Sequence, residues 1–72
     1  MVMEKQTFEC AFKAMRIGRH VRRPHWPEGM ELYLDRKEQT FKYITLDNPV
    51  PGLMSSFEPM TLLAEDWQVL LV

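Results

Sequence analysis

The sequence predicts an α+β domain in which one N-terminal helix packs on a small antiparallel sheet of four to five strands. Three patterns support this: apolar residues recur at helical spacing over residues 7–17, they alternate over residues 30–35, and β-branched and aromatic residues are concentrated over residues 40–46. The chain has 72 residues, which suffices for one domain (residues 1–72) and not for two. Residues 1–6 carry no such pattern and are expected to form a loose N-terminal tail.

The predicted helix has one apolar face and two recognisable ends. Its apolar residues fall at i, i+3, i+4 and i+7: Phe8, Ala11, Phe12 and Met15. Thr7 suits the N-cap, where a hydroxyl accepts a free backbone N–H, and Gly18 suits the left-handed position just past the last turn. Gly18 is therefore expected to have a structural role.

The predicted strands are separated by breakers. Residues 20–23 form a short strand that ends at a proline, and residues 30–35 and 40–46 pair as a hairpin. Along the first strand of that hairpin, Tyr33 lies on the polar face, opposite the apolar residues. A further short strand is expected over residues 53–58.

The C-terminal segment contains a predicted helical turn and a last strand. Pro59 interrupts the chain, and Thr61 is expected to cap a single helical turn over residues 62–65. Residues 67–72 form a strand that is apolar on both faces, so it is either central in the sheet or covered by a partner subunit. Trp67 begins this strand and is expected to be a half-buried structural residue.

Composition and charge exclude several classes of protein. Hydrophobic residues make up 46% of the chain, as in globular domains, and the net charge of −1 provides no general attraction to DNA, RNA or a membrane. The single cysteine, Cys10, cannot form an intrachain disulfide, and His20 and His25 lack zinc-site spacing, so no metal and no cofactor are expected. The free thiol and the lack of a hydrophobic signal core predict a cytoplasmic protein. Because so small a domain has a thin stability margin, self-association is expected.

One segment combines positive charge, an aromatic ring and a backbone stiffened by proline: it contains Arg22, Arg23, His25 and Trp26. Arginine binds phosphate through paired, charge-assisted hydrogen bonds, and tryptophan stacks on a base, so these residue types suit a nucleotide site. The alternative is a structural turn in which Trp26 covers the edge of the core and Arg23 pairs with an acid such as Asp66. From these residues alone, the structural interpretation is the better supported.

Recognised catalytic motifs are absent from the sequence. It has no phosphate-binding loop, no Gly-x-Ser-x-Gly and no paired-histidine metal signature. Cys10, in the first helical turn, is interpreted as a buried, inert thiol rather than a nucleophile. We therefore expect that the protein is not an enzyme.

Two segments resemble the Thoeris anti-defence family of the second type, which consists of small phage and prophage proteins. Residues 18–26 are similar to the family pattern Gly-basic-x-Val-x-Arg-x-x-Trp, and residues 62–67 are similar to its Leu-Leu-Ala-Glu-Asp-Trp segment. The resemblance covers roughly residues 7–69. The matching positions in the first segment are Gly18, Arg19, Val21, Arg23 and Trp26.

This resemblance implies an α+β fold and a sponge function. Family members bind cyclic nucleotide-type immune signals and hold them, without cleavage, at sites between subunits of a homo-oligomer. For this protein the implied ligand is a cyclic ADP-ribose isomer or a cyclic oligonucleotide, and the implied assembly is a homodimer or homotetramer in the cytoplasm of an infected bacterium. The implied ligand-binding residues are Arg22 and Arg23 on phosphates, His25 as a hydrogen-bond partner, and Trp26 with Tyr33 on a base. Adjacent strand residues point to opposite sides, so one of Arg22 and Arg23 is expected to face the ligand, and the sequence leaves open which.

Two other functions stay open from the sequence. The same basic, tryptophan-bearing turn suits a protein that binds and inhibits a host protein, because tryptophan and arginine are enriched at interfaces. A small enzyme that degrades the signal is the third candidate, and chemical change in the released ligand would distinguish it.

Overall fold

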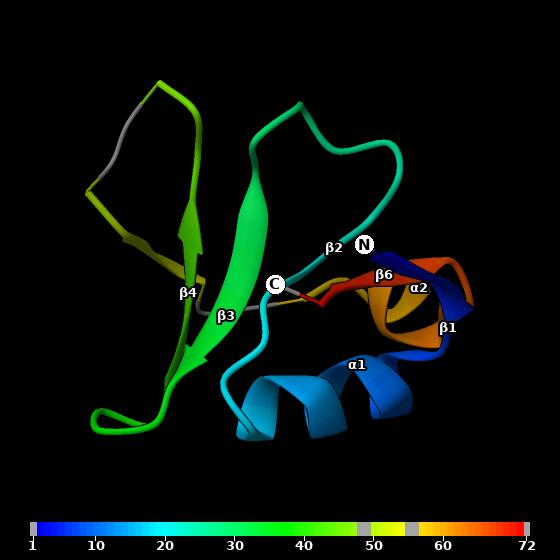
Figure 1. Ribbon diagram of the computed structural model, residues 1–72, viewed down its shortest axis with the longest axis horizontal. Helices are drawn as coiled ribbons and strands as arrows, with labels where there is room; N and C mark the ends of the chain where they lie inside the picture. The colour runs from blue at the N-terminus through cyan, green and yellow to red at the C-terminus, as the bar shows by residue number, and fades with distance from the viewer. Residues whose placement is uncertain (1, 48–49, 55–56, 72) are drawn as a thin grey trace.

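Six antiparallel strands form one sheet in the order β1-β6-β2-β3-β4-β5, and helix α1 packs on one face of this sheet in the computed structural model (Figure 1). The structure describes residues 2–47, 50–54 and 57–71. The elements are β1 (Val2–Gln6), α1 (Phe8–Arg16), β2 (Val21–Arg22), β3 (Glu31–Asp35), β4 (Thr40–Ile44), β5 (Gly52–Met54), α2 (Pro59–Leu63) and β6 (Trp67–Leu70).

Strand β1 is the main departure from the predicted fold. The prediction of a loose tail over residues 1–6 is wrong for residues 2–6, which pair with β6 and raise the number of strands above the four to five expected. Nearly every β1 residue is exposed, so the strand has no alternating apolar pattern and is held by backbone pairing with β6. The register shifts between Met3 and Gln6, where Lys5 has a φ of 57°.

Strand β6 lies between β1 and β2, and this position explains its apolar sequence. Trp67 and Val69 face α1 and are buried, whereas Gln68 and Leu70 are half-buried on the opposite face. Of the two interpretations of this segment, the central position in the sheet is therefore confirmed. Residue 72, at the end of the predicted strand, lies outside the described residues.

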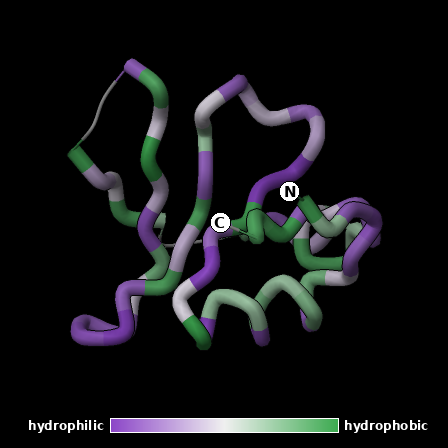
Figure 2. Tube along the Cα trace, in the orientation of Figure 1, coloured by the Kyte–Doolittle hydropathy of each residue, from purple (hydrophilic) through white to green (hydrophobic). Residues whose placement is uncertain are grey.

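Helix α1 supplies the helical half of the core, as predicted. The hydroxyl Oγ1 of Thr7 accepts the backbone N–H of Cys10 at 3.2 Å, and Gly18, just past the helix, has a φ of +94°. Ala11 and Met15 are fully buried. The sheet residues that complete the core are Val21, Leu32, Trp67 and Val69. Figure 2 shows hydrophobic colouring along α1 and hydrophilic colouring at the turn of the β3–β4 hairpin.

The β3–β4 hairpin alternates as the sequence predicts. Leu32 is fully buried against α1, and Tyr33 lies on the opposite face of the sheet. Its turn is held by Asp35, whose Oδ1 accepts the backbone N–H groups of Lys37 and Glu38 at 3.1 and 3.2 Å. The turn is thereby fixed beside the C-terminal end of α1, where Arg36 reaches the helix.

Helix α2 begins at Pro59 rather than after it. The predicted cap at Thr61 is wrong: Thr61 lies inside the helix, and Glu58 occupies the N-cap without a side-chain hydrogen bond. Proline suits the first helical position because its missing N–H would have no partner there. The carbonyl of Thr61 accepts the indole N–H of Trp67 at 3.2 Å, which docks the helix onto the core.

The remaining elements are short. Strand β5 covers only part of the predicted segment over residues 53–58, of which residues 55–56 lie outside the described residues. Among the described residues, neither helix is both long enough and apolar enough to cross a membrane.

Candidate functional site

The Arg23 side chain joins the turn after β2 to the start of β6. Its Nε donates to Asp66 Oδ1 at 2.8 Å and its Nη2 donates to Asp66 Oδ2 at 3.1 Å, and the side chain is only 15% exposed. These hydrogen bonds lower the pKa of the Asp66 carboxyl below its ordinary value, against the opposing effect of desolvation. The guanidinium carbon also lies 5.9 Å from the centre of the Trp67 ring. Arg23 is therefore occupied by both Asp66 and Trp67. The prediction that Trp67 is half-buried is wrong: its side chain is fully buried, because β6 lies inside the sheet under α1.

Arg22 and Trp26 hold the same turn together. The Nη2 of Arg22 donates to the carbonyl of Trp26 at 2.7 Å, and its Nε donates to the carbonyl of Arg23 at 3.3 Å. The Trp26 ring packs edge-on against Trp67, with centroids 5.5 Å apart and planes at 84°. We call residues 22–26 the Arg–Trp turn. Its two arginines and its tryptophan all make contacts that stabilise the fold.

His25 and Tyr33 lie apart from those contacts. His25 is exposed on the Arg–Trp turn, close enough to Asp66 for its charge to contribute to the lowered pKa of that carboxyl. Tyr33 stacks on His20 at 4.9 Å, and His20 Nδ1 lies 2.9 Å from Glu31 Oε1. The structure therefore brings Arg22, Arg23 and Trp26 together and places Tyr33 in a different cluster.

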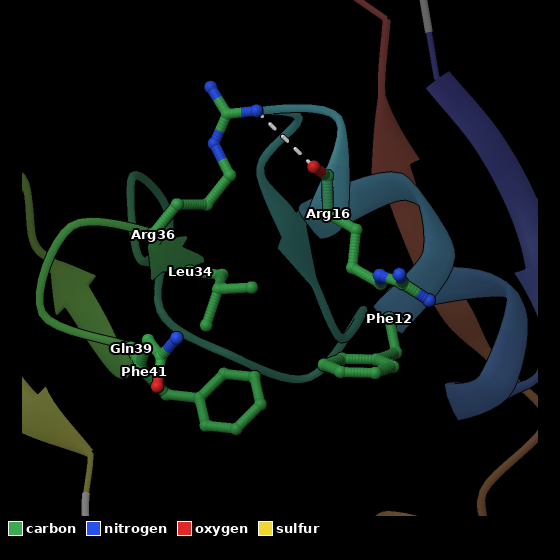
Figure 3. Close-up of a pocket in the computed structure, with 6 residues that line it drawn as sticks. All are labelled: Phe12, Arg16, Leu34, Arg36, Gln39 and Phe41. Atoms are coloured by element: carbon green, nitrogen blue, oxygen red, sulfur yellow. Dashed lines mark hydrogen bonds between the residues drawn. The ribbon is translucent and has the colours of Figure 1, made fainter.

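A different concave site lies between α1 and the β3–β4 hairpin. This hairpin cavity has a volume of 390 Å³, which falls in the range of small-molecule sites. Figure 3 shows its lining side chains, which come from the last two turns of α1, from both strands and from the turn between them. They are Phe12, Arg16, Leu34, Arg36, Gln39 and Phe41. The rings of Phe12 and Phe41 meet at 6.0 Å with planes at 50°, and with Leu34 they form an apolar floor.

The charge of the hairpin cavity is positive. Arg16 and Arg36 are both exposed, and neither guanidinium has an ion-pair partner within the described ranges of the chain. Arg36 Nη1 donates to the backbone carbonyl of Arg16 at 3.3 Å, so Arg36 is held against the C-terminal end of α1, while the Arg16 side chain extends away from the Arg36 guanidinium (Figure 3). The lining contains no acid among the residues that the structure describes.

Nearby acids of the hairpin are occupied by Lys42. Its Nζ lies 2.9 Å from Asp35 Oδ2 and 2.9 Å from Glu38 Oε2. The hydrogen bond from Lys42 lowers the pKa of Asp35, and the same contact with Asp35 raises the pKa of Lys42. Lys42 offsets one of these two negative charges and holds both carboxylates, so the acids are paired with Lys42 rather than with the two cavity arginines.

This arrangement suits an anion that carries a flat ring. Guanidinium groups bind phosphate oxygens through paired charged hydrogen bonds, the amide of Gln39 can donate and accept, and phenylalanine rings stack on bases. The sequence does not predict this site. Arg16 belongs to the basic stretch before the Arg–Trp turn. It also follows Phe12 by four residues, so the two side chains lie on the same face of the helix, and this spacing is the one feature of the sequence that points to the cavity.

A comparison with protein families matches residues 6–70 to the Tad2-like, or Thoeris anti-defense 2-like, domain. The match covers most of the chain. This protein belongs to the Thoeris anti-defense 2-like domain family. No curated protein and no solved structure matches the chain.

Family membership confirms the resemblance in the sequence and assigns this Thoeris anti-defence domain a role in evading Thoeris immunity. The matched range contains both motif segments, the Arg–Trp turn and every residue that lines the hairpin cavity. Both regions therefore belong to the anti-defence domain.

Proposed function

We propose that this Thoeris anti-defence domain sequesters a cyclic nucleotide-type immune signal in the hairpin cavity and does not cleave it. One observation supports the proposal above all: Arg16 and Arg36 lie beside an aromatic floor, and no acid among the described residues pairs with them or lines the cavity. The ligand class is a cyclic ADP-ribose isomer or a cyclic oligonucleotide, and the setting is the cytoplasm of an infected bacterium.

The cavity chemistry supplies enough affinity for a sponge. A hydrogen bond to a charged group contributes about 1.5–3 kcal/mol, and a stacked base contributes about 1–3 kcal/mol. Two arginines and one stacked ring together approach the roughly 8 kcal/mol that corresponds to micromolar affinity. A second nucleotide or phosphate of the same ligand, held by Gln39 or by another subunit, adds to this.

Sequestration without turnover agrees with the lining groups. A guanidinium stays protonated at neutral pH and cannot serve as a general base, and phenylalanine and leucine have no reactive group. The described residues that line the cavity include no carboxylate, imidazole, thiol or hydroxyl. The proposal is therefore binding alone, with the protein as a homodimer or homotetramer.

Isothermal titration calorimetry tests the site. The panel consists of cyclic dinucleotides, cyclic trinucleotides and cyclic ADP-ribose isomers. Arg16→Gln and Arg36→Gln are expected to abolish binding or to weaken it by at least tenfold, while the circular dichroism spectrum stays unchanged. Lys37→Gln is the matched control, because Lys37 is exposed in the same turn but does not line the cavity. Mass analysis of ligand released by heating is expected to recover it unaltered.

Two variants separate the hairpin cavity from the ligand-binding residues that the sequence predicts. His25→Ala and Tyr33→Phe change predicted ligand residues without removing a buried ring. Binding that is lost in His25→Ala and kept in Arg36→Gln would move the site to the turn. If the folded wild type shows no heat of binding with any member of the panel, the alternative is favoured, a protein that binds and inhibits a host protein.

A further inference from the structure

Helix α2 presents apolar side chains to solvent. Met60 is 81% exposed and Leu63 is 80% exposed, and no residue of α2 is buried. Glu58 lies immediately before the helix and Glu65 follows it, and both are exposed. We call these four residues the α2 knob: two apolar side chains with an acid at either end.

An apolar groove with positive charge lies on another part of the molecule, between α1 and strands β1 and β6. Its volume is 300 Å³, and Ile17, at its rim, is 69% exposed. Lys13 and Arg19 are its charged lining residues, and its described lining contains no acid. The only ion-pair contact that Lys13 makes among the described residues is a loose one of 3.8 Å to exposed Glu9. The apolar residues of the groove are Met3, Ala14, Ile17, Val69 and Leu71.

The two surfaces are complementary in charge and in apolar character, and neither is covered by the residues that the structure describes. We propose that the α2 knob of one copy docks in the α1–β1 groove of a second copy, with Met60 and Leu63 in the groove and the two acids facing Lys13 and Arg19. This inference rests on the self-association proposed above and names the surfaces that produce it. It does not depend on the ligand or on the hairpin cavity.

The β1 edge of the sheet favours docking of side chains over pairing of strands between two copies. Strand β1 is an edge strand, and edge strands can pair with another chain. Here the register shifts between Met3 and Gln6, and Lys5 adopts a left-handed conformation, so the edge is not regular enough to template a further strand. At the β1 edge, side-chain docking is therefore favoured over strand pairing. Because knob and groove are different surfaces, each copy can engage a neighbour through both.

Charge reversal with complementation tests the pairing. In analytical ultracentrifugation the wild type is expected to associate, whereas the groove variant Lys13→Glu/Arg19→Glu and the knob variant Glu58→Lys/Glu65→Lys are each expected to sediment as monomers. An equimolar mixture of the two variants is expected to restore a complex with one copy of each. A wild type that stays monomeric, or variants that associate as the wild type does, would overturn the proposal.

Cross-linking gives a second measurement that does not depend on how well the charge variants fold. Cys10 lines the groove and is exposed, so the prediction that it is buried is wrong. It is the sole cysteine of the chain, so an introduced cysteine can form a mixed disulfide with Cys10 alone. Oxidised Leu63→Cys is expected to form disulfides between Cys10 and the introduced cysteine of another copy, identified by peptide mass. Leu53→Cys, on β5 and 61% exposed, is the control. Equal cross-linking by the two variants would contradict the proposal. Ligand titration of the charge variants measures the sponge function separately, so failure of the docking proposal and failure of the proposed function give different results.

Discussion

In the Arg–Trp turn both arginines are occupied by the fold, whereas in the hairpin cavity both guanidiniums lack an acid partner among the described residues. Arg23 is paired with Asp66 and lies against Trp67, and Arg22 donates to two carbonyls of its own turn. Arg36 donates to one carbonyl of α1 and retains donors for other partners. The two regions contain the same residue types, arginine beside aromatic rings.

The difference shows that arginine next to tryptophan is not by itself a sign of a ligand site. What separates the two regions is the partner of the guanidinium and the position of the ring. The Trp26 ring packs on Trp67 at the edge of the core, so it contributes to stability. Phe12 and Phe41 also contact the core, but part of each ring lines a cavity. Substitutions in the turn should therefore change stability, and polar substitutions in the cavity should change binding.

The largest effect on stability is expected from substitution of Trp67, against which the Arg–Trp turn packs. Trp67→Ala removes a fully buried ring and is expected to lower the free energy of unfolding by about 3–5 kcal/mol, much of the total for a small domain. Urea unfolding followed by circular dichroism measures this. Leu53→Ala, at an exposed position, is the control and should stay within about 0.5 kcal/mol of the wild type. A loss below 1 kcal/mol for Trp67→Ala would contradict the assignment of Trp67 to the core.

The next effect concerns the cavity. Arg36→Gln is expected to weaken ligand binding by about 30-fold, because one charged hydrogen bond worth about 2 kcal/mol is lost. Its free energy of unfolding is expected to change little, since the side chain is exposed. Titration calorimetry and urea unfolding of the same sample measure both quantities. Unchanged affinity together with a large loss of stability would show that Arg36 stabilises the fold and does not bind the ligand.

A smaller effect is expected at Asp66, and it depends on pH. Asp66→Asn removes the charge that Arg23 faces and, because the carboxylate is 46% exposed, is expected to cost only about 1 kcal/mol at pH 7. The folded pKa of Asp66 is lowered, so its stabilising contribution is present above the ordinary value of 3.8 and is lost as the pH falls through the folded pKa. The stability difference between wild type and variant should therefore shrink below pH 3.8. A difference that stays constant down to the lowest pH at which both fold would argue against the ion pair.

The smallest effect is expected at Lys42, outside both regions. Lys42→Gln leaves the carboxylates of Asp35 and Glu38 without their cation, close to the cavity arginines. It should weaken binding of an anionic ligand by about threefold at low salt and by less at high salt, since screening reduces such interactions. Titrations at two salt concentrations measure this, with Lys37→Gln as the matched control. An equal loss in the two variants would show that the pairing of Lys42 has no specific effect.

The local elements could be predicted from the sequence because their signals are local. The apolar face from Phe8 to Met15 and the alternation around Leu32 determine α1 and the hairpin. Strand β1 could not be predicted, because its exposed side chains carry no pattern and its pairing depends on β6, more than 60 residues away in the chain. The sequence offers the link between Arg23 and Asp66 only as an alternative, because tertiary contact decides which acid meets the guanidinium.

The hairpin cavity was missed for the same reason. The sequence predicts that Arg16 is an exposed helical residue and that Arg36 lies in a polar turn. No local pattern of residues indicates that the two lie close together. Their proximity depends on the packing of α1 against the sheet and on the turn held by Asp35, after which Gln39 has a φ of 56°.

The most direct test of the comparison is a ¹H–¹⁵N spectrum of the arginine Nε–H groups, recorded while a panel nucleotide that binds in calorimetry is added. The protein is small enough for every arginine Nε signal to be assigned by substitution. We predict that the signals of Arg16 and Arg36 shift with saturation at the calorimetric stoichiometry, while the signal of Arg23 stays in place. Shifts at Arg22 and Arg23, with Arg16 and Arg36 unchanged, would contradict the assignment of the ligand to the hairpin cavity.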